Sequence, residues 1–157
     1  MTVRYRAAMP EDAEQLVELR AVMIDELTES HSSPDEPWWQ LSAAWFREHL
    51  GGGQVVAFVA DDAGRLLAGA VGIVELRPPR PANPSGRAGH VSSVATRRDA
   101  RRQGHARAVV GMLLDWFDAN DVPSQDLTSS AAAEQLYLSL GFHDHPERYL
   151  RRSTPRD

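Results

Sequence analysis

Hydrophobic residues in the first third of the chain recur at the spacing of helices. Leu16, Leu19, Met23 and Leu27 follow Pro10 at intervals of three or four, which predicts a helix that ends near Leu27. A second helix is predicted over 38–50, and three consecutive glycines end it.

The pattern then changes to that of strands. Apolar runs bounded by turn residues predict strands over 2–8, 54–60, 65–76, 88–96, 124–130 and 147–153. Helical spacing returns in two segments, which predicts helices over 103–120 and 131–140. Because strands and helices alternate in the second half, at least one parallel strand pair is expected, and no linker or repeat divides the chain.

Composition narrows the class of protein. Of the 157 residues, 42% are hydrophobic and 25% are charged, as in a soluble globular domain. Cysteine is absent, which excludes disulfides and a cysteine nucleophile. No apolar run is long enough to span a bilayer, and the N-terminus lacks the apolar segment of a secretory signal, so we expect a cytoplasmic protein without membrane partners. The net charge of −5 argues against nucleic-acid binding.

The segment "RRDARRQG" lies between the predicted strand that ends at Thr96 and the next helix. The first backbone N–H groups of a helix have no partner inside it, and the helix dipole adds positive potential, so this end suits a phosphate. Gly104 lacks a Cβ and would let a phosphate approach the backbone. The same residues, taken alone, are equally compatible with an ordinary turn beside solvated arginines.

Two motifs carry a resemblance to a known family. "VSSVATRRDARRQGHARAVV" resembles the central motif of the GNAT acyltransferase superfamily, a strand followed by R/Q-x-x-G-x-G/A and a helix, with Arg101, Gly104 and Ala106 at the defining positions. "AEQLYLSLGF", which ends at Phe142, resembles the second motif, A-x-x-x-Y-x-x-x-G-F. The resemblance covers nearly the whole chain. It implies one α/β (mixed α+β) domain over residues 1–157, with a twisted mixed sheet of six to seven strands, about four helices and a flexible tail of a few residues.

The resemblance also implies acetyl-CoA as the acyl donor. The residues implied to bind it are Val94, Ala95, Thr96, Arg101, Arg102, Gln103, Gly104, His105, Ala106, Arg107 and Ser130. The strand that ends at Thr96 would splay from its parallel neighbour, and the pantetheine arm would pair with backbone groups of Val94 and Thr96. A backbone N–H near Val94 or Ala95 would hold the oxyanion. Ser130 stands where the family often has asparagine, and it also suits a helix N-cap.

Two residues are candidates for proton transfer. Tyr137 matches the family tyrosine that protonates the leaving thiolate, and a phenol is protonated at neutral pH. Many relatives have an acidic base on the central strand, where this chain has Ser92 and a second serine. His90, two residues earlier, would share a face with Ser92 in a regular strand and could accept a proton, directly or through water. Glu75 and Asp126 are alternatives, as is deprotonation by water alone.

The binding site of the acceptor amine has no motif of its own in the sequence. The resemblance places it at the first two helices, which include Trp38, Trp39 and Trp45, and at the proline-rich loop "RPPRPANPSGR". The tryptophans could form an aromatic wall or anchor a helix on the sheet. The stiff loop could also contact a second subunit, as in a homodimer. The six histidines do not form a metal-binding spacing, so no metal is expected.

The sequence therefore predicts an acetyl-CoA-dependent N-acetyltransferase that acts on a primary amine of a small molecule or protein by direct transfer. The alternative is a catalytically silent acyl-CoA-binding module that regulates a partner. A longer acyl group is also compatible with the sequence.

Overall fold

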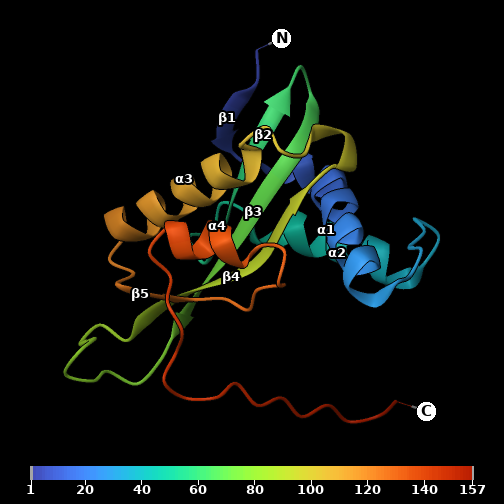
Figure 1. Ribbon diagram of the computed structural model, residues 1–157. Helices are drawn as coiled ribbons and strands as arrows, with labels where there is room; N and C mark the ends of the chain where they lie inside the picture. Colours follow the sequence, from blue (N-terminus) through green and yellow to red (C-terminus); the bar gives the residue numbers. More distant parts are fainter. Residues whose placement is uncertain (1, 157) are drawn as a thin grey trace. The chain divides into compact units, whose positions relative to one another are not determined.

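The computed structural model describes residues 2–156 and divides the chain into two compact units, one up to Leu127 and one from Thr128 onward. The first unit contains a five-stranded sheet in chain order (Figure 1). Its strands are β1 (Arg4–Ala7), β2 (Val55–Asp62), β3 (Arg65–Leu76), β4 (Arg87–Thr96) and β5 (Ser124–Asp126). Neighbouring strands are antiparallel except β4 and β5, which form the expected parallel pair.

Three long helices cover this sheet. They are α1 (Ala13–Thr28), α2 (Pro37–His49) and α3 (His105–Ala119), with α1 and α2 on one face and α3 on the other (Figure 1). Buried side chains of α1 and α2 pack on the first face together with Val71 and Ala95. On the second face α3 lies so close that a Cβ on Gly89 would come within 2.7 Å of the Phe117 ring. Both faces of the sheet are therefore buried in apolar side chains.

β4 contains a bulge that was not predicted from the sequence. Val71 pairs with Ser93, but Gly72 pairs with Val91, so Ser92 is an extra residue in β4. The strand is therefore not regular at Ser92, and the expectation that His90 and Ser92 share a face, which assumed regular alternation, stays a prediction.

The bulge changes the face of the sheet on which the residues after it lie. Gly89 faces Phe117 of α3, whereas the Ser93 hydroxyl donates to the sulfur of Met23 in α1. In a regular strand, positions 89 and 93 would lie on one face. His90 pairs with Ile73, which packs on the α1–α2 core, so His90 and Ser93 share the α1–α2 face.

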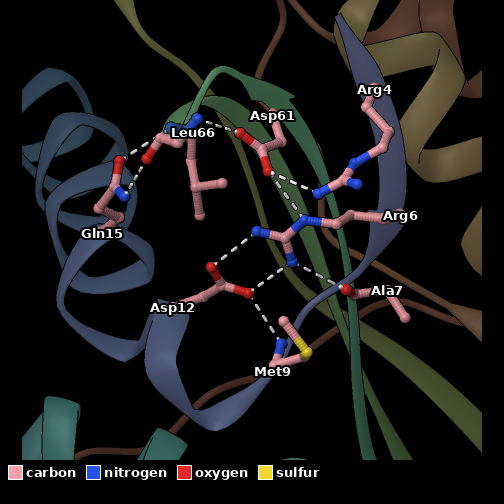
Figure 2. A network of polar contacts seen from close by, with 9 residues as sticks. Arg4, Arg6, Ala7, Met9, Asp12, Gln15, Asp61 and Leu66 are labelled. Carbon is pink, nitrogen blue, oxygen red and sulfur yellow. Dashed lines mark hydrogen bonds and ion pairs between the residues drawn. The ribbon is translucent and has the colours of Figure 1, made fainter.

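A buried ion network fixes the N-terminal strand (Figure 2). The Arg6 guanidinium donates to both carboxylate oxygens of Asp12 at 2.7 and 2.9 Å and to Asp61 at 2.9 Å. Asp12 lies in a short 3-10 helix, Pro10–Asp12, that leads into α1, and Asp61 is in β2. Gln15 adds a link from α1 to the β2–β3 turn through the carbonyl of Gly64 and the N–H of Leu66. One arginine thus connects three elements of the first unit.

The second unit differs from the sequence prediction. Its helix α4 (Glu134–Ser139) begins three residues later than predicted, and its N-cap is Ala133, so Ser130 is not the helix cap. The strand predicted over 147–153 is absent, and the sheet has five strands rather than six or seven. Tyr149 and Leu150 are 75% and 79% exposed. Being adjacent, they would project to opposite faces of a strand and could not form one apolar face.

Candidate active site

The loop between β4 and α3 has the geometry of an anion site. Arg102 and Gly104 have φ values of +62° and +83°, and this left-handed backbone delays the helix from the predicted Gln103 to His105. Within the described residues, the backbone N–H groups of Gly104, His105 and Ala106 have no hydrogen-bond acceptor. A Cβ on Gly104 would meet no atom within 4 Å, so the space in front of these donors is open. The loop can therefore accept a phosphate.

The arginines around this loop differ in their surroundings. Arg101 donates to the Thr96 carbonyl and pairs with Glu26 of α1 at 2.7 Å, and Arg98 pairs with the same carboxylate at 3.5 Å. Their first role is therefore to fasten the loop to α1. Arg102 is exposed and makes no ion pair with any other described residue, so its charge is available to a bound anion.

The Arg97 side chain is more buried than those of Arg98 and Arg101. It pairs with Glu18 at 2.6 Å and donates to the carbonyl of Leu66. The loop therefore begins from a position fixed against both α1 and β3.

His105 is turned into the protein. Its side chain is 5% exposed, Nδ1 lies 2.9 Å from the Tyr5 hydroxyl of β1, and Nε2 has no partner within the described residues. Only its backbone N–H faces the anion site. Ala106 is half-buried and Gln103 is exposed. The hydrogen bond to Tyr5 ties the start of α3 to the sheet.

The edge of β4 beside this loop lacks a strand partner over much of its length. β5 pairs with β4 only from Ala88 to His90, and from Val91 to Thr96 this edge has no strand partner in the described part of the chain. β5 ends at Asp126, so the parallel pair does not extend along the second half of β4. Ala95 is 8% exposed and belongs to the α1–α2 core, so it can contribute only backbone groups to a ligand.

The three candidates for the base lie in one network. His90 Nδ1 lies 2.6 Å from Asp126 Oδ1, Asp126 Oδ2 accepts from Arg77 at 2.8 Å, and Arg77 pairs with Glu75 at 2.7 Å. Burial raises the pKa of Asp126, but the hydrogen bonds from Arg77 and His90 outweigh it and leave that pKa below its usual value. The His90 side chain is 35% exposed, so a substrate or water can reach it.

Arg77 is the member of this network that the sequence analysis missed. It follows β3 directly, and its N–H donates to the Gly86 carbonyl at 2.8 Å, which closes the base of the proline-rich loop. Only the pairing of β4 with β5 brings Asp126 to it, and no local pattern predicts that contact.

Tyr137, in the second unit, lies in α4. Its side chain is 8% exposed, and its ring packs edge-on against Phe142 with centroids 5.9 Å apart. Burial raises the pKa of the Tyr137 phenol, so the phenol is protonated at neutral pH. Gly141 has a φ of +96° and ends the helix, as the motif predicts. Ser130 accepts a hydrogen bond from the Ala133 N–H through its carbonyl.

Two of the three tryptophans of α2 pack on the core and one is partly exposed. Trp39 is buried and Trp38 packs against the same core, so both anchor α2. Trp45 is 36% exposed and packs against the His49 ring at 5.0 Å. An aromatic wall of three rings is therefore not formed.

Residues 2–156 contain neither a metal-binding cluster nor a membrane-spanning helix. No group of three or more histidine, cysteine, aspartate or glutamate side chains is arranged to hold a metal ion there. Nor does that part of the chain contain a helix with the length and apolar content that crossing a membrane requires.

Comparison with known proteins places this fold. The profile of the acetyltransferase (GNAT) family matches residues 18–142, which is most of the chain. A search of curated protein sequences finds no match. Among solved structures, a predicted acetyltransferase from Clostridium acetobutylicum, determined with acetyl-CoA, superimposes with a TM-score of 0.81 at 22% identity and covers 96% of both chains.

Two other structures are similar. A GCN5-related N-acetyltransferase from Ralstonia eutropha JMP134 gives a TM-score of 0.81 at 19% identity, covering 96% of this chain and 99% of that one. The glucosamine-6-phosphate N-acetyltransferase of Arabidopsis thaliana gives 0.71 at 19% identity, covering 100% of both.

The five-stranded mixed sheet with helices on both faces is the fold of GNAT acetyltransferases. The chain belongs to the GNAT acetyltransferase family, whose members use acetyl-CoA.

Proposed function

We propose that this protein is an N-acetyltransferase that moves the acetyl group of acetyl-CoA directly to a primary amine of a small molecule or protein. The observation that carries the proposal is the open row of backbone donors at Gly104, His105 and Ala106, which suits a pyrophosphate. Arg102 and Gln103 border this row, and Arg107 lies in the first turn of α3. The unpaired edge of β4, with Val94, Ala95 and Thr96, suits a pantetheine arm that pairs as a strand would, and Ser130 is proposed as a further contact.

The reaction forms a C–N bond and breaks a C–S bond, and the protein must move two protons. His90 accepts the proton that the ammonium group of the acceptor loses, directly or through one water. A backbone N–H at Val94 or Ala95 donates to the oxygen that becomes negative at the acyl carbon. Tyr137 donates its phenolic proton to the departing sulfur. The side chains need form no covalent bond to the acyl group, because contact between donor and acceptor lowers the barrier.

The proposal is tested by thiol release from acetyl-CoA with a panel of amines. The panel includes spermidine, free lysine, glucosamine 6-phosphate and a peptide with an N-terminal alanine. The last two are suggested by the Arabidopsis structure and by a ribosomal-protein-alanine N-acetyltransferase from Brucella melitensis of the same fold. Amine-dependent release should fall at least about tenfold in Tyr137→Phe. Tyr149→Phe, in the same unit but 75% exposed, should keep the wild-type rate.

The outcomes separate the rival functions. Tight acetyl-CoA binding in calorimetry without stimulation by any amine would favour the silent regulatory module. A protein that does not bind acetyl-CoA at all would contradict the proposal from its first step.

A further inference from the structure

The network around His90 contains more than a base. Four side chains form this network: Glu75 of β3, Arg77 directly after β3, His90 of β4 and Asp126 of β5. The carboxylate of Asp126 is shared, since one oxygen faces His90 Nδ1 at 2.6 Å and the other accepts from Arg77 at 2.8 Å. Neither contact is required by the sheet itself. In this arrangement the carboxylate of Asp126 can orient the imidazole of His90.

The chemistry of these atoms determines where the imidazole proton lies. The lowered pKa of Asp126 leaves it ionised at neutral pH, and an ionised carboxylate only accepts hydrogen bonds. Nδ1 of His90 must therefore carry the proton in the contact with Oδ1. The lone pair of a neutral His90 is then on Nε2, the nitrogen that points away from Asp126.

The side chains around His90 carry an excess of one negative charge. Glu75, Arg77 and Asp126 together carry a net charge of −1 when His90 is neutral, and protonation of His90 brings the cluster to zero. α3 covers the opposite face of the sheet. On α1, Glu18 pairs with Arg97 and Glu26 pairs with Arg98 and Arg101, while Arg20 is half-buried. Asp126 is the charged group in direct contact with His90, through Oδ1 at 2.6 Å from Nδ1.

We propose that Asp126 is a positioning residue, held in place by Arg77, which fixes His90 as the Nδ1–H tautomer and so presents Nε2 to the acceptor amine. This inference rests on the proposed role of His90 as base. In the step itself, Nε2 takes the ammonium proton, Nδ1 keeps its own, and Asp126 remains ionised. Asp126 contacts His90 and not the substrate, so it acts only through the imidazole.

The first test measures the tautomer in the free protein. Long-range 1H–15N correlation spectra at pH 8 should show His90 with Nδ1 protonated and Nε2 unprotonated, assigned by the signal lost in His90→Gln. In Asp126→Asn the amide can donate to Nδ1, so we expect the tautomer to change to Nε2–H. A wild-type His90 with Nε2 protonated would overturn the proposal without any assay.

The second test compares two isosteric variants that each remove one negative charge from the cluster. Asp126→Asn should lower kcat with the best amine of the panel by about tenfold or more. Glu75→Gln, which contacts Arg77 but not His90, should stay within about threefold of wild type. Equal losses in both variants would mean that charge alone matters, and positioning would be rejected.

The variant His90→Gln distinguishes the proposed role of His90 as base from the proposed positioning role of Asp126. If its rate and pH profile match wild type, His90 is not the base and the proposed mechanism is wrong at that point. If His90→Gln is impaired while Asp126→Asn is not, the base assignment stands and only the positioning role of Asp126 fails. Asp126→Glu, which keeps the carboxylate, should recover part of the activity.

Discussion

At the scale of single residues, Gly104 combines two properties that usually have separate causes. Its φ of +83° favours glycine through backbone strain, and the open space beside it favours glycine through ligand approach. Gly53 has almost the same backbone, with a φ of +82° and nothing within 4 Å of a Cβ, but it lies between α2 and β2. The two positions therefore allow strain and ligand binding to be separated.

We predict that Gly104→Asp lowers the affinity for acetyl-CoA by tenfold or more, because it places a carboxylate where the pyrophosphate would bind. Gly53→Asp should cost similar stability, about 1 kcal/mol, and leave the affinity unchanged. Isothermal titration calorimetry with acetyl-CoA measures the first effect, and urea unfolding measures the second. Equal affinities in the two variants would contradict the assignment of the loop to the pyrophosphate.

At the scale of elements, the Arg6 network decides how β1 is attached to its neighbours. Hydrogen bonds from Arg6 and from the Gly64 N–H lower the pKa of Asp61. Burial raises the pKa of Asp12, but Arg6 and the Met9 N–H outweigh it, so that pKa is also lowered. Both carboxylates thus stabilise the fold above their ordinary pKa of about 3.9, and this stability is lost as the pH falls through their lowered values.

We predict that Arg6→Met lowers the free energy of unfolding by about 2 kcal/mol at pH 7, because it leaves two largely buried carboxylates without their cation. The difference from wild type should shrink below about pH 4, where the variant's carboxylates bind protons. Arg4→Met is the control: Arg4 pairs with the same Asp61 at 3.5 Å but its side chain is 74% exposed, so the loss should stay below about 0.5 kcal/mol. Urea unfolding from pH 7 to pH 3 measures both variants, and a pH-independent difference would reject the electrostatic explanation.

The same scale shows what the sequence pattern can predict. The apolar spacing located α1, α2 and α3 and the strands β2, β3 and β4 to within a few residues, because the helices bury one apolar face and the strands are apolar runs bounded by turn residues. It did not locate the bulge at Ser92, although the two consecutive serines of "HVSSV" interrupt the alternation of polar and apolar residues. It also assigned a strand to 147–153, where charged side chains surround Tyr149 and Leu150 and no buried face exists.

The candidate site was predictable where a motif is local and unpredictable where it depends on pairing. The glycine and the helix start of the phosphate loop are neighbours in sequence, so their combination could be read directly. The contact of His90 with Asp126 joins residues 36 positions apart, and that of Arg77 with Asp126 joins residues 49 apart. The parallel register of β4 and β5 creates both contacts, and no spacing rule specifies that register.

At the scale of the whole molecule, the second unit contains one helix of six residues, and an isolated helix this short is not stable in water. We therefore predict that the 157-residue chain unfolds as one domain, in a single calorimetric transition with equal calorimetric and van't Hoff enthalpies. Acetyl-CoA at about 100 times its Kd should add about 2.7 kcal/mol and raise Tm by about 5–10 °C. Acetyl-pantetheine at the same concentration has no pyrophosphate for the α3 N-terminus and should raise Tm by much less. A second calorimetric transition would show that the two units fold independently. Equal Tm shifts with both ligands would show that the loop does not bind phosphate.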